Sequence, residues 1–358
     1  MTSSIAVTGC GWVSPRGIGR VGALLSSWAA DEPTGFTSEL FAKASVDPDA
    51  ERDIGPHGGP GRRLTSAALA AARAALAESG LDRSSMGDRV GVHLGTAFGG
   101  HVGMVAFGRE IANAGARFVS PLVFPETVGN FAASSIARLL DVRGPNQTVC
   151  AGSDSGLATI SESCRLLATG CVDAMIAVGA DVLVDELASA LARQDAAVEA
   201  ARSISGARFS EGACGFVLER IEDATKRGAA ILAVLRRSTA SDDGASVSAV
   251  SCRGVGTATG RALLQEQLAS LASIPNDAPL IAADVVWGES FGMGSAAQIA
   301  LAVAAFDGHS LPIVDLRAGA VVAGSFESLS EKPAEILAIG GRSESPSILI
   351  RVTQFSPT

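Results

Sequence analysis

The sequence predicts an α/β protein built from two similar halves. Apolar, strand-like runs alternate with helical stretches along most of the 358 residues. Apolar residues make up 47% of the chain and charged residues 18%, and the 41 glycines let helices and sheets pack closely. A chain of this length exceeds the comfortable size of one hydrophobic core, so we expect a first half over residues 1–205 and a second over 206–358.

The first half contains the clearer pattern. A helix over 63–80 should end at Gly80, and another over 131–140 should follow a proline-punctuated loop at 118–130. The opening segment GCGWVS is not a dinucleotide fingerprint, because Ser14 stands where the third glycine should be. The expected strands of this half are 4–15, 90–95, 148–150 and 173–181.

The second half repeats this alternation. Strand-like segments are expected at 208–228 and 231–238, a strand at 284–289, a helix at 260–273, and a closing hairpin at 336–354. Residues 153–170 and 292–308 share one design: tiny residues in the first turn, an apolar body and a terminal glycine. Helices of this kind are buried on nearly all sides, so we expect one from each half at the centre of a duplicated unit.

Composition excludes several classes of function. The net charge of -9 and pI near 5.0 oppose binding to nucleic acid or anionic lipid. The sequence shows neither an export signal nor an 18-residue apolar run, so a cytoplasmic protein is expected. The six cysteines lack metal-like spacing, and we expect them to be small core residues, with no metal or cofactor site.

The turn at residues 150–156 leaves several chemistries open. G152-S-D-S-G156 is similar to a hydrolase nucleophile elbow with Asp154 at its centre, and His309 is the one histidine that follows it. Cys150 offers a thiol, but it should be buried at the end of an apolar strand and therefore unreactive. Ser153 would need a general base to act as a nucleophile.

Residues 144–181 resemble the nucleophile region of the β-ketoacyl synthases. The segments at 4–19, 90–100, 124–137 and 209–219 are similar to other motifs of that family, in the same order. The resemblance implies the thiolase fold, in which two βαβαβαββ halves form five layers (αβαβα).

The same resemblance implies that the family's catalytic groups are replaced. Matching G156-L-A-T-I to the family pattern puts Ser153 at the position of the nucleophilic Cys. Arg253 stands at one family His, although residues 284–289 offer a second alignment there, and Phe291 stands at the other His. Arginine stays protonated and phenylalanine has no polar group, so neither can do the work of the lost histidines. The glycine-rich motif near the end reads A338-I-G-G341 and lacks its aromatic residue.

A retained fold with a dismantled site resembles the chain length factor, the partner subunit of the ketosynthase in type II polyketide synthases. The resemblance implies a heterodimer with a catalytic ketosynthase, and an acyl carrier protein engaged mainly through that partner. Residues 121–128 match the family's interface loop. The expected tunnel and interface residues are Leu122, Phe124, Thr127, Val128 and Asn130.

Three alternatives stay open at this point. Ser153 could be an inert remnant that caps the helix, or an acyl acceptor. The chain could be a stand-alone acyltransferase or hydrolase that uses Ser153 or Asp154. It could also be a structural homodimer without a ketosynthase partner.

Overall fold

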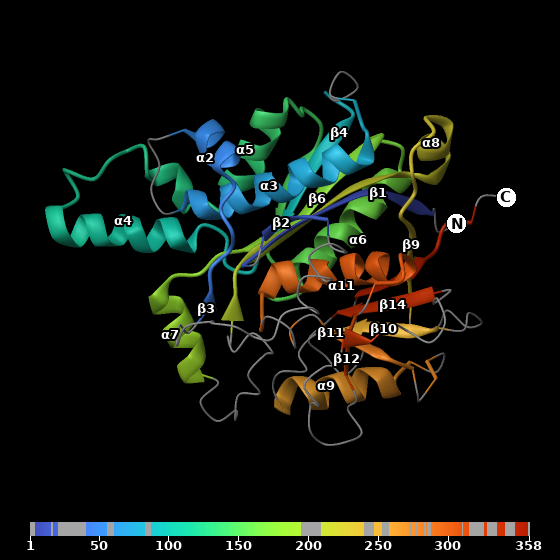
Figure 1. The fold of residues 1–358 in the computed structure, drawn as a ribbon. Helices are drawn as coiled ribbons and strands as arrows, with labels where there is room; N and C mark the ends of the chain where they lie inside the picture. Colours follow the sequence, from blue (N-terminus) through green and yellow to red (C-terminus); the bar gives the residue numbers. More distant parts are fainter. Residues whose placement is uncertain are drawn as a thin grey trace.

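The computed structural model describes most of the chain (Figure 1). The described residues are 4–15, 17–20, 41–55, 61–82, 87–194, 209–239, 247–252, 258–271, 274–275, 278–282, 284, 288–309, 311–314, 326–327, 335–340 and 348–356.

Five strands of the first half form one side of a large sheet. They are β1 (Ile5–Ser14), β4 (Val90–Gly95), β5 (Asn146–Val149), β6 (Ala174–Asp181) and β8 (Gly212–Arg220). Their spatial order is β5-β4-β6-β8-β1. Strands β5, β4 and β6 are parallel, while β8 runs antiparallel to both β6 and β1.

The second half repeats this topology. Its strands are β9 (Ala233–Ser238), β10 (Ala249–Cys252), β11 (Leu280–Ala282), β14 (Glu335–Gly340) and β15 (Ile348–Thr353). Their order, β11-β10-β14-β15-β9, matches that of the first half strand for strand, including the antiparallel fourth position. The halves join where β1 pairs with β9. The duplication expected from the sequence is therefore visible in the strand order.

Helices complete the layers seen in Figure 1. The two central helices, α6 (Ser155–Ala168) and α11 (Phe291–Phe306), pack against each other and against strands of both halves. Helices α3 (Arg62–Ser79) and α5 (Phe131–Leu140) cover the outer face of the first half, and α9 (Ala258–Ala269) lies outside the second. This is the predicted arrangement, with one small-residue helix from each half at the centre.

The predicted helix ends agree with the backbone. Helix α3 ends at Gly80, whose φ of 61° is the left-handed conformation that glycine tolerates best. Helix α6 starts one residue after its N-cap Asp154 and is followed by Gly170, whose φ is 73°.

Helix α4 (His101–Ala114) extends away from the body in Figure 1, and the sequence analysis missed it. A short 3₁₀ helix, η2 (Phe124–Thr127), lies within the predicted loop after α4 and leads into α5. The remaining described elements are α2 (Pro48–Ile54), α7 (Asp185–Gln194), α8 (Ile221–Lys226), β2 (Gly17–Gly19), β3 (Phe41–Ala42), β7 (Phe209–Ser210), β12 (Leu311–Val314) and β13 (Phe326–Glu327).

Two expectations about the second half concern residues that the structure describes only in part. The described strand near the one expected at 284–289 is β11, which ends at Ala282; Asp284 is helical, and residues 285–287 lie outside the described residues. The boundary at 205/206 also lies outside them and stays a prediction. By its pairing with β6 and β1, β8 belongs to the sheet of the first half, although the strand-like segment at 208–228 was expected in the second; residues 221–226 of that segment form the helix α8.

Candidate functional site

Ser153 lies in the turn that leads from edge strand β5 into the central helix α6. It is half-buried and directly precedes Asp154, the N-cap residue, whose side chain is 4% exposed. No hydrogen bond joins the Ser153 hydroxyl to another residue in the described part of the chain. The expectation that Ser153 caps α6 is therefore wrong, and the Asp154 side chain makes no cap bond either.

The buried hydroxyl of Ser155 fixes this turn. It accepts a hydrogen bond from the amide of Ala151 at 2.9 Å. It lies 3.0 Å from the carbonyl oxygen of Thr96 and 2.5 Å from that of Gly152, either of which can accept its proton. The turn carrying Ser153 is thereby tied to the end of strand β4.

Helix α11 supplies the missing cap from the other half of the protein. The hydroxyl oxygen of Ser295 accepts hydrogen bonds from the amides of Gly156 at 3.0 Å and Leu157 at 3.2 Å. The helices approach so closely here that a Cβ added to Gly156 would lie 2.1 Å from the Gly292 carbonyl oxygen. Only glycine fits at residue 156 in this geometry.

Phe291, which the resemblance is expected to place at a family histidine, is the first residue of α11 and has a positive φ of 51°. Its ring packs edge-to-face against Phe98, with centroids 4.7 Å apart, and stacks with Phe209 at 5.9 Å. The ring is 7% exposed. The Phe291 ring thus belongs to a buried aromatic cluster and offers no polar group.

Asp181, at the end of β6, joins the two turns that carry Phe98 and Phe291. Its carboxylate accepts hydrogen bonds from the Thr96 hydroxyl at 2.6 Å, the Phe98 amide at 3.1 Å and the Gly292 amide at 2.7 Å. Burial raises the pKa of Asp181 to about 6, against the effect of these donors. The sequence analysis did not identify this residue, because its partners come from distant segments.

The described histidines do not serve Ser153. His93, in β4, hydrogen-bonds the Ser163 hydroxyl through Nδ1 at 3.0 Å, and the His101 ring contacts Phe98 with centroids 5.4 Å apart. Burial lowers the pKa of each to about 4. His309 follows the C-terminal end of the 16-residue helix α11, about 24 Å along the axis from the end that contacts α6. This placement disfavours the hydrolase-like elbow in which His309 would serve Asp154.

Other predicted positions are only partly described. Arg253 and Gly341 lie outside the described residues. In the A338-I-G-G341 motif, the Ile339 amide donates to Gln298 Oε1 at 3.1 Å. A Cβ on Gly340 would lie 3.2 Å from Asp154 Oδ1, so this segment runs beside the start of α6.

Cys150 is exposed, and the expectation that it is buried is wrong. It follows β5, which lies at one edge of the described sheet and is itself half-exposed. Partial desolvation still raises the pKa of its thiol, so the prediction of low reactivity keeps a physical basis. Cys171 is also exposed, whereas the other four cysteines are buried as expected.

The expected tunnel and interface residues lie on one surface segment. Leu122, Phe124 and Val128 are 64%, 55% and 45% exposed. Thr127 is half-buried and donates its hydroxyl proton to the Phe124 carbonyl at 2.7 Å. Asn130 is an exposed N-cap of α5 without a side-chain cap bond. The assignment of these residues to a tunnel stays a prediction.

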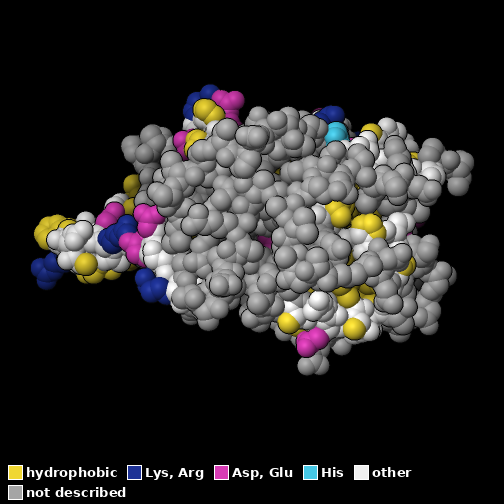
Figure 2. Space-filling view, turned by 60° about the horizontal axis from the view of Figure 1, so that its bottom comes forward, with side chains coloured by type: hydrophobic (Ala, Val, Ile, Leu, Met, Phe, Trp, Pro, Cys, Tyr) yellow, Lys and Arg dark blue, Asp and Glu magenta, His cyan; other side chains and the backbone are white. Residues whose placement is uncertain are grey.

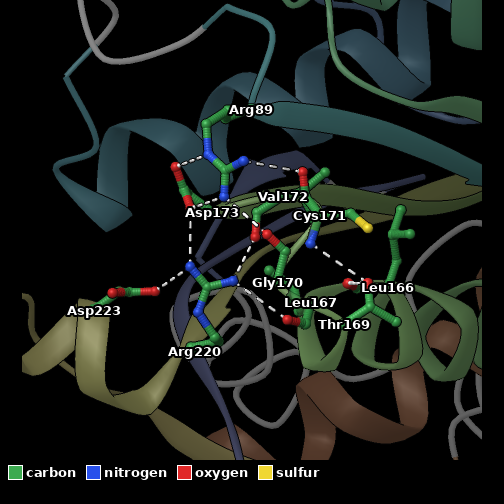
Figure 3. Close-up of polar contacts among 10 residues, drawn as sticks. All are labelled: Arg89, Leu166, Leu167, Thr169, Gly170, Cys171, Val172, Asp173, Arg220 and Asp223. Carbon is green, nitrogen blue, oxygen red and sulfur yellow. Dashed lines mark hydrogen bonds and ion pairs between the residues drawn. The ribbon is translucent and has the colours of Figure 1, made fainter.

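The far end of α6 is held by two arginines (Figure 3). Arg220 donates to the carbonyl oxygens of Leu167 and Val172, and Arg89 to that of Gly170. Both guanidinium groups bind the Asp173 carboxylate, and Arg89 in particular lowers the pKa of that group to about 2. Cations at a helix C-terminus complement its partial negative charge, so the central helix is anchored at both ends.

The described residues contain no cluster of three or more His, Cys, Asp or Glu side chains arranged for a metal ion. Among them there is also no helix that combines the length and apolarity needed to cross a membrane.

Comparisons with known proteins agree with this architecture. Residues 62–224 match the model of the β-ketoacyl synthase N-terminal domain. A 3-oxoacyl-[acyl-carrier-protein] synthase 2 of Rhizobium meliloti is 30% identical over 267 residues, covering 64% of this chain and 62% of that protein. Actinorhodin polyketide putative beta-ketoacyl synthase 1 of Streptomyces coelicolor is 30% identical over 256 residues, covering 63% and 55%.

Solved structures are similar over almost the whole chain. The ishigamide ketosynthase/chain length factor aligns with a TM-score of 0.78 at 19% identity, covering 99% of this chain and 100% of that one. The ketosynthase complex AntDE:AntF aligns with a TM-score of 0.76 at 17% identity, with the same coverage. The chain thus has the thiolase-like fold and is similar in sequence to β-ketoacyl synthases, although it spans less than two thirds of the length of these curated relatives.

Proposed function

We propose that this relative of the β-ketoacyl synthases is a chain length factor. In this role it pairs with a catalytic ketosynthase of a type II polyketide synthase and shapes the tunnel that holds the growing acyl chain. The observation that carries the proposal is the state of residue 153, a serine whose hydroxyl contacts no base in the described structure. A serine hydroxyl has a pKa far above that of a thiol and needs such a base to attack an acyl group.

The surroundings of Ser153 support a non-catalytic role. Phe291, which the resemblance matches to a family histidine, packs its ring between Phe98 and Phe209, and it can neither accept a proton nor stabilise an enolate. His93 is engaged with Ser163. Acyl transfer would therefore have to be performed by another polypeptide.

A surface suited to such a polypeptide lies close by. Figure 2 shows hydrophobic side chains, mixed with charged ones, on the projecting α4 segment at the left of the view. Phe107 and Phe124 pack their rings 5.8 Å apart, which holds η2 against α4. The apolar residues with large exposed fractions on and after α4 are Met104, Ile111, Phe118, Leu122, Phe124 and Val128.

An open strand edge belongs to the same half of the protein. Strand β5 pairs only with β4 in the described sheet, and its Asn146 side chain donates to the Ala133 carbonyl of α5 at 3.0 Å. Clustered apolar side chains and an open strand edge both favour association with a protein partner.

Two similar solved structures support the class of partner. One carries the name ketosynthase/chain length factor, and another is described as a type II polyketide synthase acyl-carrier protein in complex with its ketosynthase bound to the hexaketide. By analogy we propose a heterodimer here, with the acyl carrier protein bound mainly through the catalytic partner. The acidic balance of this chain is consistent with a secondary role toward an acidic carrier.

Labelling with an acyl group tests the proposal. The purified chain, offered a radiolabelled acyl thioester alone, should take up no label, whereas the pair should be labelled on the ketosynthase. Label on this chain that is lost in Ser153→Ala but kept in Ser134→Ala, an exposed serine of α5, would show acyl transfer by Ser153 and overturn the proposal.

Co-expression separates the proposal from a structural homodimer. A chain length factor should be recovered in equal amounts with its ketosynthase and lose stability without it, since binding stabilises the folded state. A stable homodimer that ignores the ketosynthase would favour the structural alternative.

A further inference from the structure

The hydroxyl of Ser295 has all its hydrogen-bonding capacity in use at the junction of α6 and α11. It accepts from the amides of Gly156 and Leu157 and lies 3.2 Å from the Gly292 carbonyl oxygen, to which it donates. Ser295 is fully buried. These contacts bridge residues 139 and 138 positions apart in the sequence, one from each half of the protein.

This bond pattern is that of a helix cap supplied in trans. The first amides of a helix have no partner within it, and the N-cap side chain ordinarily accepts from the second or third of them. In α6 these are Gly156 and Leu157, and the N-cap Asp154 does not bind them. A side chain of the second central helix therefore performs the capping.

The chemical consequence concerns residue 153. Free amides at a helix N-terminus carry partial positive charge and lower the pKa of a nearby thiol. We propose that Ser295 is a positioning residue that withdraws these amides from the nucleophile position and locks the first turn of α6 to α11. The site is then catalytically inactive for two independent reasons: residue 153 is a serine, and the amides beside it are already capped. This inference adds to the proposed non-catalytic role. The capping by Ser295 does not depend on that role, and only its significance for function rests on the proposed function.

Titratable groups lie beside residue 153 in the chain and on the segments that contact Phe98 and Phe291. They are Asp154 at the N-cap, Cys150 after β5, Asp181 at the end of β6, His101 in α4 and Glu289, whose Oε1 accepts from the Phe291 amide at 2.7 Å. Their charges contribute to any titration at this position. All the variants compared below lack the Cys150 thiol and keep the other groups. A difference between them therefore isolates the effect of Ser295.

The test introduces a thiol as a reporter at residue 153. The full chain, in the assembly in which it is purified, carries Ser153→Cys and Cys150→Ser, and iodoacetamide alkylation of this reporter thiol is followed against pH by peptide mass spectrometry. Adding Ser295→Ala should lower the midpoint of alkylation by about half a pH unit to one unit, because the amides become available to the thiolate. An unchanged or raised midpoint would overturn the inference.

Ser163→Ala is the matched control. Ser163 is also a fully buried serine at the central helix layer, but it bonds the His93 ring instead of main-chain amides. This variant should leave the alkylation midpoint of the reporter thiol unchanged, and a shift equal to that of Ser295→Ala would contradict a specific role. The buried thiols Cys10, Cys164, Cys214 and Cys252 should stay unmodified in every variant, which reports that the fold is intact.

A measurement on the unmodified chain tests the inference without a variant that must fold. The amides of Gly156 and Leu157 should exchange with deuterium as slowly as those of the second turn of α6. Helix α4 provides the comparison, because its N-cap Gly100 has no side chain to bind the first amides. Exchange at Gly156 and Leu157 as fast as in the first turn of α4 would overturn the capping. None of these measurements involves a polyketide product. The capping inference can therefore be wrong while the proposed function is right, and the proposed function can be wrong while the capping inference is right.

Discussion

Gly156 of α6 lies directly against the main chain of Gly292 of α11, with room for no side-chain atom between them. A Cβ on Gly156 would stand 2.1 Å from the Gly292 carbonyl oxygen and 2.8 Å from the Ala296 amide nitrogen. Backbone atoms cannot move aside as a flexible side chain can. The contact between the two halves therefore depends on the absence of a side chain at 156.

We predict that Gly156→Ala lowers the free energy of unfolding by about 3 kcal/mol or more, since the helices must separate to admit the methyl group. Gly108→Ala is the control, because Gly108 lies within α4 with nothing within 4 Å of an added Cβ. There alanine should stabilise by roughly 0.5–1 kcal/mol through its higher helix propensity. Urea unfolding of both variants checks this, and equal effects would contradict it.

Phe291 should show an inverted preference between alanine and glycine. Its φ of 51° is costly for a residue with a Cβ, whereas glycine adopts it freely. Both Phe291→Ala and Phe291→Gly lose the contacts with Phe98 and Phe209. We expect the glycine variant to be more stable than the alanine variant by about 1 kcal/mol, measured by thermal or urea unfolding. A more stable alanine variant would show that the backbone relaxes on loss of the ring.

His93 should make stability fall with acid. Its pKa is about 4 in the folded chain, below the ordinary 6.5, because burial disfavours the charged form, against the attraction of Glu162. The unfolded chain therefore binds a proton first, so stability is fully present above pH 6.5 and is lost as the pH falls toward 4. A shift of this size corresponds to roughly 3 kcal/mol as an upper estimate.

Comparison with His93→Asn isolates this effect, since asparagine keeps a polar atom near Nδ1 for Ser163 but does not titrate. Asp181 acts with the opposite sign between about pH 4 and 6, because its raised pKa favours the protonated form in the folded state. The measured quantity is therefore the wild-type free energy of unfolding minus that of the variant, from pH 7 to 4. A difference that stays constant with pH would contradict the prediction.

Sequence patterns predicted the elements that depend on residues close together in the sequence. Helices α3, α5 and α6 and the β14–β15 pair follow from hydrophobic period and from turn residues such as Gly80. Helix α4 was missed because residues such as Met104 and Ile111 face solvent, so its apolar positions do not mark a buried stripe.

The site was harder to predict because its contacts cross the chain. Ser153 and Phe291 were selected because of their positions in motifs. Ser295 was not, because in GMGSAAQ it is one small residue among several. The amides that Ser295 caps, like the partners of Asp181, are more than 80 residues away and leave no periodic signal. The exposure of Cys150 depends on whether another strand pairs beyond β5, which a single sequence does not state.

The tunnel assignment can be tested through product length. If Leu122 and Thr127 face the end of the partner's acyl tunnel, Leu122→Trp or Thr127→Phe in the co-expressed pair should shorten the main polyketide product, analysed by mass spectrometry. Each extra methylene in such a wall changes selectivity by about 1 to 3 kcal/mol, enough to favour earlier termination.

Val46→Trp controls for the effect of a large exposed side chain as such, because Val46 is 60% exposed and precedes α2, outside the 121–128 loop. That variant should keep both the yield and the length of the wild-type product. Leu122 is 64% exposed in the single chain, so a bulkier residue there meets no obstacle to folding, and any change must arise in the assembled pair. Unchanged length in a pair that still assembles would place the tunnel elsewhere, whereas failure to assemble would assign Leu122 to the interface without tunnel contact.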